Sequence, residues 1–171
     1  MERVAFAIPT FNEAPLIGLA IASVPVAELA KDRYETAEYV VDGRSADLTR
    51  DFAVQKGARV ITEERSGKGA AILTAFRAVD ADSVIVVDGV NTYLISVVTE
   101  MTRLLQANDV VIGSRLKGSV EPGAMTRLNV VGEYPPFAPR VDPVWATYQR
   151  RVHGFWAYRS DVSKEGTSLC T

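Results

Sequence analysis

The feature that most constrains this chain is a series of continuous apolar runs that alternate with helix-like segments. Five runs are largely apolar on successive residues, at 3–8, 39–41, 58–61, 83–87 and 109–113. Strands of this kind are buried on both faces, which is typical of parallel sheets covered by helices. The alternation predicts an α/β domain with a mostly parallel central sheet and helices on both faces.

Proline, glycine and asparagine mark the expected boundaries of these elements. Pro9 is expected to end the first strand, and Gly57 is expected to close a helix over residues 46–56. Asn12 is expected to cap the first helix. The side chains that fall at helical spacing in that helix, and that we expect on its buried face, are Leu16, Leu19 and Ala20.

Composition and charge argue against several classes of function. A net charge of -2 over 171 residues provides no bulk attraction to nucleic acid, so we expect no nucleic-acid partner. A single cysteine, Cys170, and a single histidine, His153, can form neither an internal disulfide nor a His/Cys metal cluster. We find no apolar window of about 18 residues, which predicts no transmembrane segment and a cytoplasmic protein.

Familiar nucleotide-binding and hydrolase motifs are also missing from the sequence. No G-x-G-x-x-G follows the first strand, which excludes the dinucleotide fingerprint. The Gly-Lys-Gly at 67–69 lacks the spacing and the Ser/Thr of a Walker A loop, which excludes an ordinary P-loop NTPase. There is no G-x-S-x-G elbow, so a Ser–His hydrolase is poorly supported.

Polar side chains follow several of the apolar runs at the point where each run ends. In chain order they are Thr10, Asn12, Glu13, Asp42, Asp88, Ser114 and Arg115. The carboxyl ends of parallel strands lie at one edge of a sheet, and ligands of open α/β sheets bind outside that edge. The sequence therefore predicts a ligand site there.

Five short motifs in register make the chain similar to a known family. They are IPTFNE at 8–13, VVDGRSAD at 40–47, GKGAA at 67–71, VD at 87–88 and IGSR at 112–115. In this order and spacing they resemble family 2 glycosyltransferases of the GT-A fold, nearest the dolichol- and polyprenol-phosphate mannosyltransferase branch. The segments EPGAM at 121–125 and GFWAYR at 154–159 resemble the same branch.

The resemblance implies a three-layer, Rossmann-like GT-A domain whose donor is a nucleotide-diphosphate sugar, GDP-mannose or UDP-glucose. The residues that it implies for donor binding are Pro9, Thr10, Asn12, Glu13, Asp42, Lys68, Gly69, Asp88 and Gly89. The carboxylate of Asp42 or Glu13 can accept hydrogen bonds from base N–H groups or ribose hydroxyls. Lys68 and Arg115 can offset the charge of the diphosphate.

The resemblance further implies a divalent cation, Mg²⁺ or Mn²⁺, held by Asp88 and Asn91, with Asp88 and Arg115 as the catalytic residues. The family usually has Asp-X-Asp at this place, whereas here Val90 occupies the position of the second Asp, and valine cannot ligate a metal. Two hypotheses follow. The chain is a hexosyltransferase acting on a polyprenyl phosphate or a related acceptor, or it is a catalytically impaired nucleotide-sugar-binding domain.

Charge divides the chain into two parts. Residues 1–111 hold 11 Lys and Arg against 16 Asp and Glu, whereas residues 112–171 hold 8 against 5. We interpret residues 1–171 as a single domain with a nucleotide-sugar-binding half (1–111) and an acceptor-side half (112–171), in which the proline-rich stretch 133–153 is atypical. The basic second half suits an anionic lipid phosphate, which predicts peripheral association with the inner face of a membrane.

Overall fold

One mixed sheet forms the centre of the protein. The computed structural model describes residues 1–87, 95–112 and 156–161. The strands in these ranges are β1 (Glu2–Thr10), β2 (Tyr34–Asp42), β3 (Arg59–Thr62), β4 (Ser83–Val86), β5 (Val110–Ile112) and β6 (Trp156–Arg159). Their order is β3-β2-β1-β4-β6-β5, and β1 pairs in parallel with both β2 and β4. The predicted mostly parallel sheet is confirmed.

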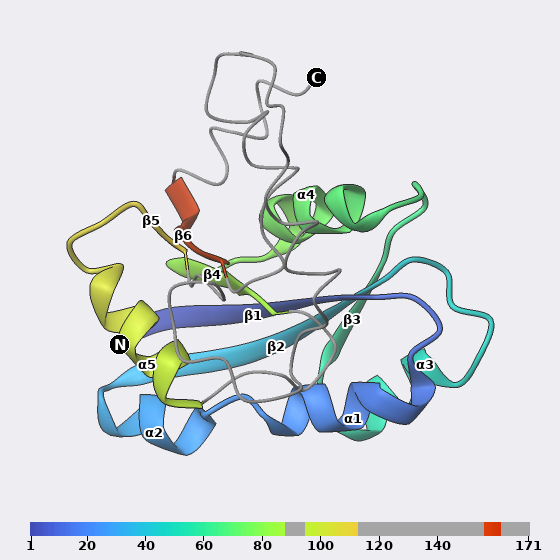
Figure 1. Cartoon of the computed structure of the whole chain (residues 1–171), viewed down its shortest axis with the longest axis horizontal. Coiled ribbons are helices and arrows are strands. Elements are labelled where there is room, and N and C mark those ends of the chain that lie inside the picture. The colour runs from blue at the N-terminus through green and yellow to red at the C-terminus, as the bar shows by residue number, and fades with distance from the viewer. Residues whose placement is uncertain (88–94, 113–155, 162–171) are drawn as a thin grey trace, which may run out of the picture. The chain divides into compact units, whose positions relative to one another are not determined.

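Helices cover both faces of this sheet. They are α1 (Ala14–Ala22), α2 (Val26–Lys31), α3 (Thr49–Gln55), α4 (Lys68–Ala78) and α5 (Ile95–Leu104). Figure 1 shows α1, α2 and α3 on one face of the sheet and α4 on the other. The predicted layering is therefore confirmed for the described residues.

The two faces of β1 carry side chains of different size. Phe6 and Ile8 are fully buried in the large core cluster that they form with residues of α1, α2 and α5. On the opposite face Ala5 and Ala7 are equally buried but small, and α4 packs against this part of the sheet. The centre of β1 is thus buried on both faces, as its continuous apolar run predicted.

Pro9 does not end the first strand. β1 continues through Pro9, which lies opposite Val41 of β2, and ends at Thr10. The Ala7 carbonyl accepts a hydrogen bond from the Val87 amide, next to β4. Because the backbone groups of every second residue in a strand point to the same side, those of Pro9 also point toward β4. The pairing of β1 with β4 ends at Ala7, so the missing N–H of the proline removes no bond from that ladder.

The predicted start of the first helix was wrong, and its predicted buried face was right at Ala20 but wrong at Leu16 and Leu19, which are exposed. The helix begins at Ala14 with Glu13 at the N-cap position, and Asn12 precedes it with a positive φ of 54°. The exposed fraction of Leu19 is 53%, whereas the buried residues of α1 are Ile17, Ala20 and Ile21. With Val24 these positions form a complete i, i+3, i+4, i+7 stripe, which competes with the leucine stripe in the sequence.

Strand β6 was not predicted, since the last strand expected from the sequence was the apolar run at 109–113. It lies between β4 and β5 and runs antiparallel to both. Ala157 and Tyr158 are buried in the sheet, and the Tyr158 ring contacts Phe76 of α4 with ring centroids 4.9 Å apart. The aromatic run Phe-Trp-Ala-Tyr was the available signal, because aromatic residues favour strands.

The expectation that no apolar stretch is long enough to cross a membrane needs correction. Within the described residues, Ala14–Lys31 is such a stretch by length and composition, with a mean hydropathy of 1.4. In the fold it is divided between α1 and α2, and Ile17, Ala20 and Leu29 of this stretch lie in the core beneath the sheet. Helices packed in a protein core satisfy the same test, so the stretch is weak evidence for a membrane span.

The corrected buried face of α1 can be tested with two substitutions on the same helix. Ile17→Ala should lower the free energy of unfolding by about 2–5 kcal/mol, because it leaves a cavity in the core. Leu19→Ala should change it by roughly 0.5 kcal/mol, because that side chain is half exposed. Urea unfolding followed by circular dichroism measures both. A larger loss for Leu19→Ala than for Ile17→Ala would contradict the observed orientation of α1.

Candidate functional site

The carboxyl ends of β1, β2 and β3 are tied together by backbone hydrogen bonds. The Gly43 amide donates to the Thr10 carbonyl at 2.9 Å, and the Glu63 amide donates to the Asp42 carbonyl at 2.8 Å. Thr10 and Asp42 also lie opposite each other in the β1–β2 register. Two of the residues predicted for donor binding, Thr10 and Asp42, are thus brought side by side at this edge, and both are buried.

Asn12 joins the loop after β1 to the loop after β2. Its amide N–H donates to Ser45 Oγ at 2.8 Å, and its side-chain Oδ1 accepts from the Ala46 amide at 2.8 Å. Asparagine tolerates the positive φ that this position requires better than most residues do. In the structure Asn12 therefore fixes the two loops to each other, and its contact with a donor stays a prediction.

The start of α1 is capped by one side chain from the loop after β2 and by one from the first residue of α3. The Glu13 amide donates to Thr49 Oγ1 at 2.9 Å, and the Ala14 amide donates to Asp47 Oδ2 at 3.1 Å. Hydrogen bonding from Thr49 holds the pKa of Asp47 below its usual value. The positive end of α1 is thus already occupied by a protein carboxylate, which makes it a poor place for a phosphate group.

Asp42 is the buried carboxylate at the end of β2. Its Oδ2 accepts from the Ser45 amide at 3.0 Å and lies 3.7 Å from Nε of Arg50. Its Oδ1 is buried and has no hydrogen-bond partner among the described residues. A buried acceptor without a partner destabilises the protein by about 1–3 kcal/mol, so this atom is suited to a donor group of a ligand.

A second buried carboxylate, Glu63, follows β3 and was missed by the sequence analysis. Its Oε1 accepts from the Arg65 amide at 2.7 Å and its Oε2 from Arg65 Nη2 at 3.0 Å. Thr74 Oγ1 donates to Oε2 as well. The hydrogen bonds from Arg65, followed by the one from Thr74, lower the pKa of Glu63 to about 2. The available signal was position, because Glu63 follows the third apolar run as Asp42 follows the second.

The predicted Lys68 and Gly69 lie in the first turn of α4. Gly67 is the N-cap residue, with a φ of 101° that favours glycine, and it has no side chain with which to cap the helix. Lys68 is exposed, and a Cβ on Gly69 would meet no atom within 4 Å. The start of α4 is therefore open to solvent and carries a cation.

Several predicted site residues lie outside the described residues: Asp88, Gly89, Asn91 and Arg115, together with Val90 and the stretch 133–153. The last described residue before Asp88 is Val87, whose amide donates to the carbonyl of Ala7 in β1. Within residues 1–87, 95–112 and 156–161, no three His, Cys, Asp or Glu side chains gather to hold a metal ion. The metal ligands and catalytic residues therefore stay predictions.

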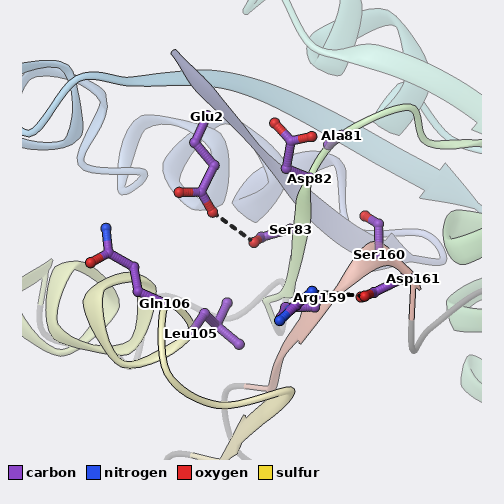
Figure 2. A pocket seen from close by; sticks show the side chains of 9 residues that line it. All are labelled: Glu2, Ala81, Asp82, Ser83, Leu105, Gln106, Arg159, Ser160 and Asp161. Carbon is purple, nitrogen blue, oxygen red and sulfur yellow. Dashed lines mark hydrogen bonds and ion pairs between the residues drawn. The ribbon is translucent and has the colours of Figure 1, made fainter.

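A pocket of about 520 Å³ lies at the opposite edge of the sheet (Figure 2). It is lined in part by Glu2 and Ser83, the first residues of β1 and β4, and by Arg159, the last residue of β6. Its three acidic groups already have partners. Glu2 accepts from Ser83 Oγ at 3.4 Å, Asp82 accepts from the Arg3 amide at 2.7 Å, and Asp161 pairs with Arg159 at 2.8 Å. The pocket is separate from the predicted ligand edge.

Comparison with known proteins identifies the family. Residues 5–167 match the family described as Glycosyl transferase family 2. The chain belongs to glycosyl transferase family 2. It is 38% identical over 133 residues to Glycosyltransferase AglJ of Haloferax volcanii, a match that covers 77% of this chain and 42% of AglJ. It is 31% identical over 162 residues to a Dolichyl-phosphate hexose transferase of the same organism, covering 94% of this chain and 68% of that protein.

Solved structures of other proteins have the same fold as this family 2 chain. Glucosyl-3-phosphoglycerate synthase from Mycobacterium tuberculosis in complex with UDP superposes with a TM-score of 0.66 at 20% identity, covering 94% of this chain and 58% of that one. This likeness confirms the predicted three-layer GT-A fold. The chain spans less than half the length of AglJ and about a third of the hexosyltransferase Agl6 of Haloferax volcanii.

The lowered pKa of Glu63 predicts a pH dependence of stability. Because the folded state holds this pKa near 2, below its ordinary 4.5, the stabilisation is complete above the ordinary value and is lost as the pH falls toward 2. The difference in unfolding free energy between the wild type and Glu63→Gln should therefore shrink as the pH is lowered from about 5 to about 3.

Urea unfolding at several pH values in this range measures that difference, with the exposed neighbour substitution Glu64→Gln as the matched control. A difference for Glu63→Gln that stays constant over the same range would contradict the predicted protonation behaviour.

Proposed function

We propose that the carboxyl edge of β1, β2 and β3 binds a nucleotide-diphosphate sugar and that the chain transfers its hexose, mannose or glucose, to an acceptor. The observation that carries the proposal is the buried Oδ1 of Asp42, which lacks a partner among the described residues. A base N–H or a ribose hydroxyl supplies the donor that this oxygen requires. Thr10 lies beside it in the β1–β2 register and forms the other wall of this part of the site.

The diphosphate would lie toward α4 rather than α1. Both helices begin at the same sheet edge, but the start of α1 is occupied by Asp47 and Thr49. The start of α4 instead presents Lys68 beside glycines. A cation at an open helix N-terminus attracts phosphate groups through both its charge and the helix dipole.

A divalent cation is part of the proposal, since relatives of the same fold are solved with Mg²⁺ or Mn²⁺ together with UDP. Asp88 and Asn91 would hold it, and Asp88 directly follows Val87 at the end of β4. Such an ion neutralises charge on a leaving diphosphate. Arg115 would add a second cationic contact to the same group.

The acceptor that we propose is a polyprenyl phosphate or a related compound. A relative covering 94% of the chain is a Dolichyl-phosphate hexose transferase, and the basic half 112–171 has the charge sign that suits a lipid phosphate. The bond from the anomeric carbon to the diphosphate breaks, a bond to an acceptor phosphate oxygen forms, and the nucleoside diphosphate leaves. We propose that residues 1–171 form one cytoplasmic domain peripheral to the inner face of the membrane.

The alternative is a catalytically impaired domain that binds the nucleotide sugar without turnover. The observation that favours it is Val90, which stands where family members usually have the second metal-binding Asp. Because Asp42 and Lys68 are retained in both cases, donor binding does not distinguish the two functions.

Donor binding is tested by calorimetry with UDP-glucose and GDP-mannose. One of them should bind the wild type and raise its Tm, and Asp42→Asn should weaken binding about 10- to 100-fold. The amide oxygen of the variant would be held by the Ser45 amide, which turns an NH₂ group toward the donor of the ligand. Asp51→Asn, an exposed position on α3, is the matched control. The absence of binding by any nucleotide sugar would refute the proposal.

Transfer is tested with the radiolabelled donor, a polyprenyl phosphate and Mn²⁺. Labelled lipid should form, and Val90→Asp should strengthen the dependence on Mn²⁺, because a second carboxylate adds a hard anionic ligand. Donor binding without any labelled lipid would support the impaired domain. An unchanged Mn²⁺ affinity in Val90→Asp would show that the metal ligands lie elsewhere.

A further inference from the structure

Three side chains clamp the end of β3 to α4, and we call Glu63, Arg65 and Thr74 the Glu63 clamp. Arg65 Nε donates a hydrogen bond to Glu63 Oε1 at 3.1 Å, and Arg65 Nη2 donates one to Glu63 Oε2 at 3.0 Å. Arg65 Nη2 lies 3.2 Å from Thr74 Oγ1, which itself donates to Glu63. Every member of the clamp therefore contacts the other two.

The Glu63 clamp holds the chain at Arg65 and at Ala70, so only a short segment lies between these two held positions. Arg65 Nη2 also donates to the Ala70 carbonyl at 3.4 Å, so Arg65 is bound both to the end of β3 and to the first turn of α4. Residues 66–69 span the interval, and they include Gly67 at its positive φ and Lys68. With both ends held, the backbone position of Lys68 is set by the clamp.

Burial and charge favour a positioning role over a direct one. The exposed fraction of Glu63 is 4%, and both of its oxygens already accept hydrogen bonds from the protein. Arg65 has two of its donor nitrogens committed to Glu63. The cation of this loop that the clamp does not contain is Lys68.

The clamp is also connected to the predicted base-binding side of the site. The Glu63 amide donates to the Asp42 carbonyl at 2.8 Å, so Glu63 and Asp42 belong to adjacent, bonded strand ends. A nucleoside diphosphate contacting both Asp42 and Lys68 requires a fixed separation between them. Glu63 connects the two residues, because its amide is bonded to Asp42 and its carboxylate is bonded, through Arg65, to the first turn of α4.

We propose that Glu63, acting through Arg65 and Thr74, is a positioning residue that fixes Lys68 relative to Asp42 and so sets the affinity for the diphosphate part of the donor. This inference rests on the proposed function. It predicts that loss of the clamp weakens the binding of nucleoside diphosphates while leaving the binding of the nucleoside alone unaffected.

The test uses the full chain with UDP and GDP by calorimetry and with uridine and guanosine by NMR titration. Glu63→Gln and Thr74→Val should each weaken the bound diphosphate about 10-fold while changing the nucleoside Kd by less than about 2-fold. Thr74→Ser retains the hydroxyl and should restore the diphosphate affinity. If Glu63→Gln fails to fold, the comparison of Thr74→Val with Thr74→Ser decides, because valine preserves the shape of threonine.

The outcomes separate this inference from the proposed function. Diphosphate binding at wild-type strength in both clamp variants would overturn the inference and leave the proposed function standing. An equal loss for nucleoside and diphosphate would show a general structural role and would also overturn it. Tighter diphosphate binding in Glu63→Gln would identify Arg65, once released, as a direct ligand. A wild type that binds none of the four compounds would overturn both.

Discussion

The nine-residue parallel pairing of β1 with β2 is the constraint on which the candidate site depends. It runs from Glu2 opposite Tyr34 to Thr10 opposite Asp42, so both strands end at the same level. Both loops that follow must then leave the sheet side by side, and they bond to each other through Asn12 and Ser45. A shift of this pairing by one residue would turn Asp42 to the other face of the sheet and move it out of its position opposite Thr10.

The same arrangement places the N-termini of α1 and α4 at one edge of the sheet, where different side chains surround them. The first amides of α1 are bonded by Asp47 of the neighbouring loop and by Thr49, the first residue of α3, and the Asp47 carboxylate offsets the positive end of the helix. The start of α4 has glycine at its cap and Lys68 as its first residue. Of the two N-termini, the start of α4 is the one that carries a cation, and α4 lies on the side of the sheet opposite α1 (Figure 1).

The parallel sheet could be predicted from the sequence, because a strand segment that is buried on both faces has apolar side chains at successive positions. The central parts of these strands are apolar on successive residues, as in residues 4–8 of β1 and 39–41 of β2, and their order along the chain predicted the sheet. The phase of α1 could not be predicted, since the stripe through Ile17 and the stripe through Leu19 both fit a helix. The capping by Thr49 and the insertion of β6 depend on contacts between distant segments, which local patterns do not encode.

Asp42 and Glu63 show why residue type alone does not identify a ligand site. Both are acidic and buried, and both lie at the carboxyl end of a parallel strand, Asp42 as the last residue of β2 and Glu63 directly after β3. The protein itself supplies donors to both oxygens of Glu63, and the lowered pKa of that carboxyl follows from them. For Asp42 the described residues supply donors to one oxygen only. Because a buried carboxylate is stable only when its acceptors are satisfied, Glu63 is complete within the fold, whereas Oδ1 of Asp42 requires a donor from outside the described residues, which in our proposal is the ligand.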